Sequence, residues 1–219
     1  MTSTHRDDDV EIDADPARLA GHLTLPNGAT GIVLFAHGSG SSRHSARNLL
    51  VARALNRAGL GTLLFDLLTP AEEPDRNKVF DIELLAERLT AATRWLRGEE
   101  ESSGRLIGYF GASTGAAAAL WAASSPESHV SAVVSRGGRP DLAGPRLAEV
   151  RAPTLLIVGS EDHTVLELNR QAAAQLRCET ALTIVAGATH LFEERGTLAR
   201  AAELARDWFL QHLGAPSVG

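Results

Sequence analysis

Short runs of β-branched residues and leucine alternate along the chain with longer segments whose apolar residues recur every three or four positions. The short runs are typical of buried strands, and the longer segments are typical of helices with one apolar face. Eight strands are predicted, the first from the weakest pattern: residues 10–13, 21–25, 31–36, 61–66, 105–110, 130–135, 153–158 and 181–185. Five helices are predicted: residues 45–58, 81–97, 114–124, 165–177 and 197–212.

This alternation indicates an α/β fold, in which a mostly parallel sheet of about eight strands has helices on both faces. A Pro-Asn-Gly turn signal at 26–28 follows the second strand, and we expect it to join an antiparallel pair before the parallel strands begin. About 17 residues separate the strands at 130–135 and 153–158, which is too few for a lid domain.

The chain shows no internal repeat, no low-complexity block and no linker. A single domain over residues 1–219 is therefore predicted. We expect residues 1–9 and 214–219 to be flexible at its two ends.

The composition is that of a folded globular protein, because 44% of the 219 residues are hydrophobic and 22% are charged. The net charge is −6 and basic residues are scattered along the chain, so neither a nucleic acid nor a membrane surface is an expected partner. The only cysteine, Cys178, excludes an internal disulfide, and the first nine residues lack the apolar core of a secretory signal. We therefore expect a cytoplasmic protein.

The strongest chemical motif is Gly-Ala-Ser-Thr-Gly at 111–115, which lies between the strand at 105–110 and a helix of small residues. A Gly-x-Ser-x-Gly sequence in this setting is typical of a sharp turn that raises the serine above the sheet, with glycines where side chains would collide. The helix N-terminus adds backbone N–H groups that favour developing negative charge. Ser113 is therefore the candidate nucleophile.

A serine hydroxyl needs a base, and the base needs an orienting acid. Asp162 follows the strand at 153–158, and His190 follows the strand at 181–185. The order Ser113, Asp162 and His190 is the one expected of an α/β-hydrolase triad. Neither a metal nor a cofactor is predicted.

Two backbone N–H groups are expected to form an oxyanion hole. Thr114, the residue after the candidate nucleophile, provides the first. Ser39, in the His-Gly-Ser-Gly sequence that ends the strand at 31–36, provides the second. Candidate substrate contacts come from loops at the same edge of the sheet: Gly38, Leu67, Arg136 and Leu191.

The sequences at 37–40 and 111–115, together with Asp162 and His190, resemble the α/β-hydrolase superfamily and its small dienelactone hydrolase-like branch. This resemblance extends from about residue 29 to the C-terminus and implies the fold and the triad.

The segments 65–69 and 135–140 are also similar to the hydrolase portion that is fused to phosphoribosyltransferases in some bacterial proteins. Dienelactone hydrolases proper use a cysteine nucleophile, whereas this chain has Ser113 in that position. Its only cysteine, Cys178, is interpreted as a packing residue.

Several other polar residues are rivals for catalytic roles. His163 follows Asp162 directly and is interpreted as a loop residue, and His37 as a support of the oxyanion loop. Asp66 also ends a strand at this edge and is a rival for orienting a histidine, although it precedes Ser113 in the chain.

Arginines near the same edge allow two interpretations. Arg136 and Arg139 follow the strand at 130–135, where ligands bind in open α/β sheets, and could bind a substrate carboxylate or phosphate. Arg43 and Arg47 offer the same possibility after the oxyanion loop. In a chain whose basic residues are almost all arginine, the interpretation of these four as surface residues is favoured.

The sequence thus predicts a serine hydrolase that cleaves a small carboxylic ester or a related acyl bond through an acyl-enzyme on Ser113. Lactone, thioester or acyl-peptide hydrolysis would use the same residues. A non-catalytic ligand-binding homologue is the other alternative, and the complete triad weighs against it. The expected partner is a small acyl substrate, and the oligomeric state stays open.

Overall fold

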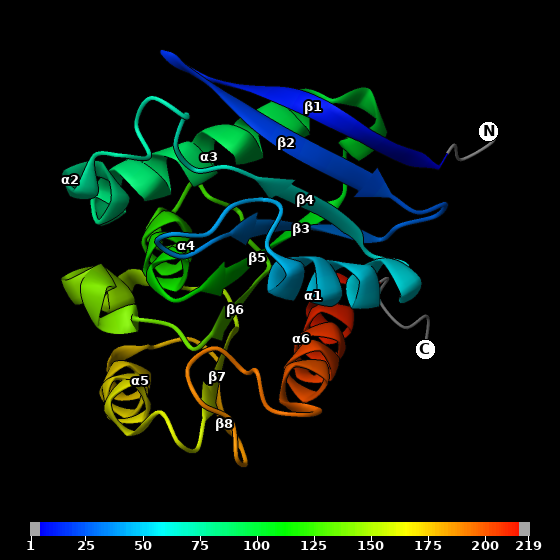
Figure 1. Cartoon of the computed structure of the whole chain (residues 1–219). Coiled ribbons are helices and arrows are strands. Elements are labelled where there is room, and N and C mark those ends of the chain that lie inside the picture. Colours follow the sequence, from blue (N-terminus) through cyan, green and yellow to red (C-terminus); the bar gives the residue numbers. More distant parts are fainter. Residues whose placement is uncertain (1–4, 215–219) are drawn as a thin grey trace.

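Within residues 5–214, which the computed structural model describes, eight strands form one sheet (Figure 1). The strands are β1 (Arg6–Ala14), β2 (Ala17–Leu25), β3 (Gly31–Ala36), β4 (Gly61–Phe65), β5 (Leu106–Ala112), β6 (Ala132–Arg136), β7 (Thr154–Gly159) and β8 (Thr180–Val185). The α-helices are α1 (Ala46–Arg57), α2 (Arg76–Val79), α3 (Ile82–Gly98), α4 (Thr114–Ser124), α5 (His163–Gln175) and α6 (Thr197–Leu213). Two 3₁₀ helices are η1 (Glu100–Ser102) and η2 (Pro140–Glu149).

The strands lie in the order β1-β2-β4-β3-β5-β6-β7-β8. All neighbours from β4 to β8 are parallel, and β2 is antiparallel to both β1 and β4. The prediction of a mostly parallel sheet with an antiparallel beginning is therefore confirmed. The turn assigned to that beginning was wrong: residues 26–28 lead from β2 to β3, which are not neighbours, and the hairpin turns at Asp15 and Pro16.

Strand β1 is longer than its apolar pattern indicates. Residues 6–9, expected to be flexible, are its first residues, and Arg6 lies opposite Leu25 of β2. The three aspartates that follow Arg6 are exposed, because β1 is an edge strand whose outer surface faces solvent. The N-terminal half of β1 therefore has no apolar alternation to detect. Residues 1–4 and 215–219 lie outside the described part of the chain.

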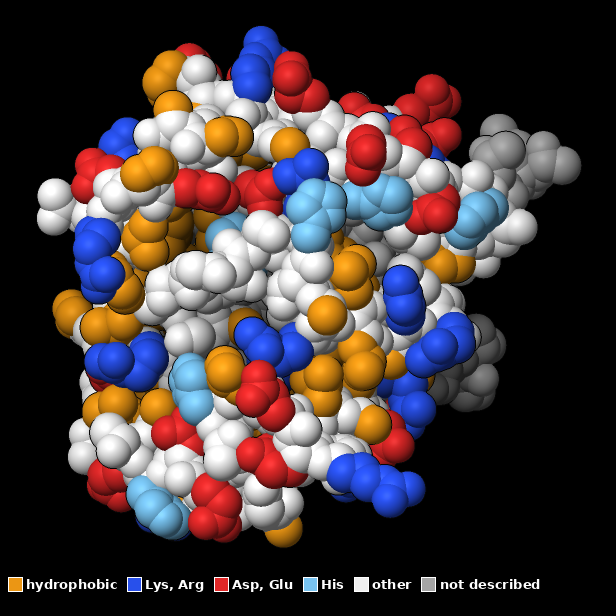
Figure 2. Space-filling view, viewed as in Figure 1, with side chains coloured by type: hydrophobic (Ala, Val, Ile, Leu, Met, Phe, Trp, Pro, Cys, Tyr) orange, Lys and Arg blue, Asp and Glu red, His pale blue; other side chains and the backbone are white. Residues whose placement is uncertain are grey.

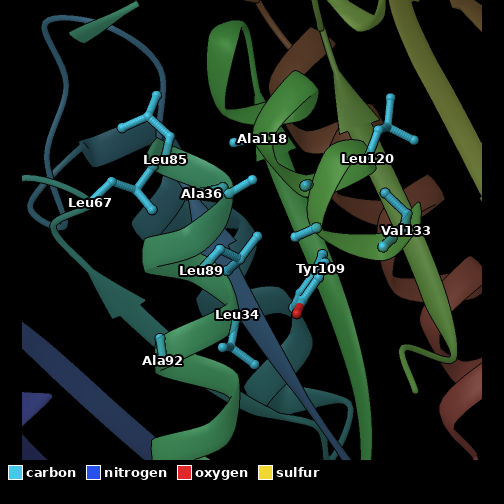
Figure 3. Close-up of a cluster of buried hydrophobic side chains, with 14 of the residues drawn as sticks. Leu34, Ala36, Leu67, Leu85, Leu89, Ala92, Tyr109, Ala118, Leu120 and Val133 are labelled. Atoms are coloured by element: carbon cyan, nitrogen blue, oxygen red, sulfur yellow. The ribbon is translucent and has the colours of Figure 1, made fainter. Parts of the chain in front are cut away.

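Alternate residues of each central strand pack on opposite faces of the sheet. Leu34 of β3 packs in a buried cluster with Leu89 of α3 and Leu120 of α4 (Figure 3). Its neighbour Phe35 belongs to a second cluster, with residues of α1 and α6 such as Phe209. Full burial of one leucine contributes roughly 1.5–3 kcal/mol. The two clusters confirm that helices cover both faces.

The connections at the carboxyl edge are short. Only η2 lies between β6 and β7, so that connection has no lid domain. The helix after β7 begins at His163, two residues before its predicted start, and Asp162 is its N-cap residue. The short helices α2, η1 and η2 were not predicted, since three or four residues show no helical periodicity and η2 contains an internal Gly-Pro break.

Candidate active site

The turn between β5 and α4 places Ser113 above the carboxyl edge of the sheet. Ser113 has φ 51° and ψ −121°, a backbone conformation that costs a non-glycine residue about 1–3 kcal/mol. The flanking glycines make this turn possible. A Cβ atom at Gly111 would lie 2.4 Å from Ala116 Cα, and one at Gly115 would lie 2.1 Å from the Ala36 carbonyl oxygen. The motif is therefore a strained strand-to-helix turn, as its sequence predicted.

The predicted acid and base meet at the ends of β7 and β8. His190 Nδ1 lies 2.6 Å from Asp162 Oδ2, and the Asp162 side chain is 13% exposed. Aspartate at a helix N-cap ordinarily accepts a hydrogen bond from the first turn, but the Asp162 carboxylate makes no such bond. With Nδ1–H donating to Asp162, the Nε2 atom of His190 is the one left to accept a proton.

The end of β6 joins Ser113 to the His190 loop. The Ser113 N–H donates to the Arg136 carbonyl at 3.3 Å. A Cβ atom at the next residue, Gly137, would lie 3.1 Å from the His190 carbonyl oxygen and 3.7 Å from His190 Nδ1. The serine turn and the His190 loop therefore both lie against Arg136 and Gly137, at the end of β6. Ser113 Oγ makes no hydrogen bond with any of residues 5–214. A hydrogen bond between a catalytic serine and its histidine often forms fully only when substrate binds.

The predicted oxyanion residues also meet. A Cβ atom at Gly38 would lie 3.0 Å from both the Ser113 Cβ and the Ala112 carbonyl oxygen, so the loop after β3 lies directly on the serine turn. The Ser39 N–H donates to Thr114 Oγ1 at 2.9 Å. No pattern in the sequence indicates this hydrogen bond. It occupies the Ser39 N–H, one of the two predicted donors of the oxyanion hole.

Two side chains anchor the oxyanion loop to the end of β4. His37 Nε2 accepts from the Leu67 N–H at 3.1 Å, so its Nδ1–H donates to the Gly38 carbonyl at 3.0 Å. Burial lowers the pKa of His37, which favours this neutral form. Asp66 accepts from the Arg43 N–H at 2.7 Å and pairs with the Arg43 guanidinium. Asp66 therefore holds the loop and does not orient His190.

A cavity of about 320 Å³ lies beside this loop. Its walls include Gly38 and Leu67, two predicted substrate contacts, and its lining is completed mainly by small polar and apolar residues: Ser39, Gly40, Ser41, Ser42, Leu68, Val79, Leu85 and Thr114, with His37 and Glu73. Leu191 does not line it and is 41% exposed, next to His190. Figure 2 shows this face of the molecule, with a band of white atoms across its middle where Figure 1 places the loop after β3.

The other polar residues that the sequence singled out differ in their burial and in their partners. Arg136 is buried, whereas Arg139 pairs with Asp141 at 2.7 Å and Arg47 pairs with Glu193 at 3.4 Å. His163 is exposed in the first turn of α5, so it is a helix residue and not the loop residue that the sequence predicted. Cys178 Sγ contacts the hydroxyls of Thr154 and Thr180 at 3.7 and 3.6 Å, as expected of a packing residue.

Two further kinds of feature are absent from the described part of the chain. Among residues 5–214, no group of three or more His, Cys, Asp or Glu side chains is arranged to hold a metal ion. In the same range, no helix is long and apolar enough to cross a membrane.

The mostly parallel sheet and the strained serine turn at its carboxyl edge define an α/β-hydrolase fold. The profile of the dienelactone hydrolase family matches residues 19–215. The chain therefore belongs to the dienelactone hydrolase family, which confirms the resemblance found in the sequence.

Solved structures agree with this assignment. A dienelactone hydrolase from Anabaena variabilis has 52% identity and a TM-score of 0.92, with 95% of this chain and 98% of that chain covered. The esterase domain of a Rhodothermus marinus protein has 22% identity and a TM-score of 0.76, covering 95% of this chain and all of that one, and shares the fold.

A longer relative comes from Mycobacterium tuberculosis. It is named "Putative phosphoribosyl transferase" and is 60% identical over 211 residues, which are 96% of this chain and 48% of the relative. The chain thus spans about half the length of the curated relatives it matches. This finding agrees with the similarity to fused hydrolase portions noted in the sequence.

Proposed function

We propose that this chain is a serine hydrolase that cleaves small carboxylic esters or related acyl bonds through an acyl-enzyme on Ser113. The observation that carries the proposal is the 2.6 Å contact between His190 and Asp162 at the edge where the strained turn presents Ser113. A nucleophile, a base and an orienting acid on three separate loops are the parts that acyl transfer requires.

In the acylation step, His190 Nε2 takes the proton of the Ser113 hydroxyl as Oγ attacks the acyl carbon. The bond to the leaving alcohol then breaks, and His190 gives its proton to the alcohol oxygen. Asp162 keeps the imidazole in the tautomer that has Nε2 free and stabilises the imidazolium that forms. In the deacylation step, His190 Nε2 takes a proton from a water molecule as the water oxygen attacks the acyl carbon. The bond to Ser113 Oγ then breaks, and His190 returns the proton to the serine oxygen.

Negative charge on the acyl oxygen is stabilised by the N–H groups of Thr114 and Ser39. Because the Ser39 N–H already donates to Thr114 Oγ1, the substrate oxygen replaces or shares that bond. The walls of the adjacent cavity of about 320 Å³ include Leu67, Leu68 and Leu85, and the cavity receives the apolar part of the substrate.

Covalent labelling tests the proposal directly. The wild-type chain should react with a fluorophosphonate probe and hydrolyse p-nitrophenyl acetate, whereas Ser113→Ala should fold and lose both activities. Cys178→Ser is the matched control, because family members are known with cysteine nucleophiles, and it should keep both. Labelling that persists in Ser113→Ala would assign the reaction to another residue.

A panel of acyl donors separates the related reactions. Lactones, thioesters and acyl-peptides can react with the same three side chains, so their relative kcat/KM values define the bond that is cleaved. Stoichiometric labelling without turnover of any donor would instead indicate a ligand-binding homologue.

A further inference from the structure

The segment between β4 and α3 forms part of the cavity wall, although it has no buried residue of its own. Its residues Glu73 and Val79 line the cavity. Leu68, just before the segment, and Leu85, in α3, line the cavity as well. No residue between Leu68 and Ile82 is buried, and the short helix α2 contributes no buried side chain. Apolar packing therefore contributes little to holding this part of the wall in position.

One carboxylate connects the two ends of this segment to each other and to α3. Glu72 Oε2 accepts from the Thr69 N–H at 3.0 Å and from the Thr69 hydroxyl at 3.1 Å. Its Oε1 atom accepts from Lys78 Nζ at 3.0 Å and from Arg88 Nη2 at 3.2 Å. Glu72 and these three partners are called the Glu72 junction below.

The carboxylate of Glu72 is shielded from solvent and stays charged. Its side chain is 14% exposed. Although burial raises the pKa of this carboxyl, hydrogen bonds from Thr69 and Lys78 and the charge of Arg88 lower it to about 2. Hydrogen bonds to an ionised acceptor are stronger than those between neutral groups. The four contacts therefore hold the segment across the whole range in which the fold is studied near neutral pH.

Arg88 connects the junction to the rest of the fold. It is 7% exposed, and its Nη1 atom donates to the Ala14 carbonyl, at the end of β1, at 2.7 Å. Among residues 5–214, Glu72 is its only carboxylate partner. A buried guanidinium is unfavourable unless it is paired, so the contact with Glu72 is strongly specified.

Each residue of the Glu72 junction is adjacent to a residue that lines the cavity. Three of these pairs are neighbours in the sequence and the last is one helical turn apart: Thr69 and Leu68, Glu72 and Glu73, Lys78 and Val79, and Arg88 and Leu85. The junction thus fixes four parts of one wall relative to one another. Glu72 itself does not line the cavity.

We propose that Glu72 determines which esters the cavity accepts, because it holds the wall formed by Leu68, Glu73, Val79 and Leu85 at a fixed width. Glu72 acts through those residues and does not touch the reacting atoms, so it is a positioning residue. This inference rests on the proposed hydrolase function, in which the cavity receives the apolar part of the substrate. A fixed wall contacts a long alkyl chain along its length, whereas a methyl group makes few of these contacts.

Two pairs of esters test the proposal. p-Nitrophenyl acetate and hexanoate differ in the acyl chain, and methyl and hexyl acetate differ in the alcohol. In the wild type, the pair whose long chain enters the cavity should show a preference in kcat/KM for its long member. Glu72→Gln should reduce this preference by about 4- to 15-fold, since each of one or two methylene groups that lose their contacts changes binding by about fourfold.

The separate kinetic constants distinguish a positioning role from general damage. For the preferred long ester, Glu72→Gln should raise KM and leave kcat within about twofold, because the wall contacts the chain equally in the ground state and in the transition state. For the short member of the same pair, both constants should stay within about twofold. Equal losses on short and long esters, or no wild-type preference in either pair, would overturn the proposal.

Three further variants sharpen the test. Glu203→Gln removes a carboxylate from the exposed side of α6, where Glu203 pairs with Arg200 at 3.1 Å, and should leave the preference unchanged. Glu72→Asp keeps the charge on a shorter side chain and should retain part of the preference that Glu72→Gln loses. Lys78→Met leaves the buried pair of Glu72 and Arg88 in place, so it tests the junction even if Glu72→Gln does not fold. It should reduce the preference in the same direction and by less.

A double variant shows whether the two residues act through one junction. Adding Lys78→Met to Glu72→Gln should reduce the preference no further, because both changes break the same contact. Fully additive reductions would show that Lys78 and Glu72 act independently, and the proposed junction would then be wrong.

Binding without turnover separates this inference from the hydrolase function. In isothermal titration, Ser113→Ala should bind methyl hexanoate or hexyl acetate at least about fourfold more tightly than methyl acetate, and adding Glu72→Gln should remove most of that difference. If the difference depends on Glu72 while the wild type hydrolyses no ester, the cavity wall stands and the proposed function fails. If esters are hydrolysed and neither preference nor binding depends on Glu72, the function stands and this inference fails.

Discussion

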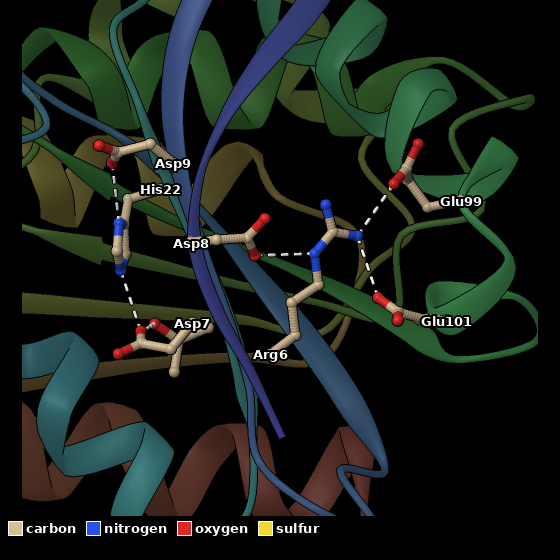
Figure 4. A network of polar contacts seen from close by, with 8 residues as sticks. Arg6, Asp7, Asp8, Asp9, His22, Glu99 and Glu101 are labelled. Atoms are coloured by element: carbon tan, nitrogen blue, oxygen red, sulfur yellow. Dashed lines mark hydrogen bonds and ion pairs between the residues drawn. The ribbon is translucent and has the colours of Figure 1, made fainter. Parts of the chain in front are cut away.

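Two histidines in this chain form close contacts with aspartates, and they differ in almost every other respect. His190 has Asp162 at 2.6 Å, and His22 lies between Asp9 and Asp7, each at 3.0 Å (Figure 4). The imidazoles are similarly exposed, at 38% and 40%. The carboxylates are not: Asp162 is 13% exposed, whereas Asp7 is 52% and Asp9 is 86% exposed.

The position in the sheet explains the difference. Asp9 lies directly opposite His22 in the antiparallel β1–β2 ladder, so their contact is an ordinary cross-strand pair at an exposed edge. Asp162 and His190 come from separate loops at the carboxyl edge, beside the strained turn of Ser113. A histidine with an aspartate is therefore no evidence of catalysis by itself. The buried carboxylate and the neighbouring nucleophile make one pair a candidate site.

The largest expected effect comes from the buried carboxylate. Asp162→Asn should lower kcat for p-nitrophenyl butyrate by about 10⁴-fold, because the amide favours the wrong imidazole tautomer. Asp9→Asn makes the same chemical change at the exposed pair and should leave kcat within twofold. If the two variants had similar activities, the assignment of Asp162 as the orienting acid would be wrong.

The oxyanion loop provides a smaller effect. His37→Asn has a side chain too short to reach both the Leu67 N–H and the Gly38 carbonyl, so the loop should lose its fixed position. We expect kcat to fall by about 10- to 100-fold, somewhat less than for complete loss of an oxyanion donor. His37→Gln places an amide oxygen near the position of Nε2 and should recover part of the loss. Unchanged kcat in His37→Asn would exclude a positioning role.

The fold and the triad could be predicted because each rests on a local pattern. Buried parallel strands give continuous apolar runs, and the chain order of strand ends places Ser113, Asp162 and His190 at one edge. The N-terminal half of β1 could not be found in this way, since its aspartates have the pattern of a solvated segment and its pairing partner is decided by the sheet. Turn signals likewise show where the chain turns but not which strands become neighbours.

The finer features of the site depend on contacts between distant residues. The Ser39 N–H meets the Thr114 hydroxyl 75 positions away, and His37 reaches Leu67 across 30 positions. Sequence reasoning named Arg136 and Arg139 together as possible anion ligands. Only the structure separates them, because it pairs Arg139 with Asp141 and buries Arg136 beside the Phe192 ring, with no ion pair to any of residues 5–214.

The two histidines with shifted pKa values should change stability with pH in opposite directions. Burial lowers the pKa of His37, so the unfolded chain binds a proton more readily than the folded chain below about pH 6.5. The free energy of unfolding should therefore fall as the pH drops from 7 to 5, by at most about 1.4 kcal/mol per pH unit from this group. Urea unfolding at both pH values should show a smaller fall in His37→Gln than in the wild type. An equal fall in both would assign the acid sensitivity to other groups.

The smallest effect is expected at the exposed pair. Hydrogen bonds with Asp9 and Asp7 raise the pKa of His22, and contacts with Thr24 and His22 lower that of Asp7. The raised pKa means that the contribution of His22 is complete below about pH 6.5 and is lost as the pH rises through the folded-state value. His22→Gln should therefore lower Tm by about one to three degrees at pH 5.5 and have no effect at pH 9. Because exposed charges are screened, 1 M NaCl should abolish the difference at pH 5.5. A Tm difference that grew with pH would show that His22 acts through packing and not through its charge.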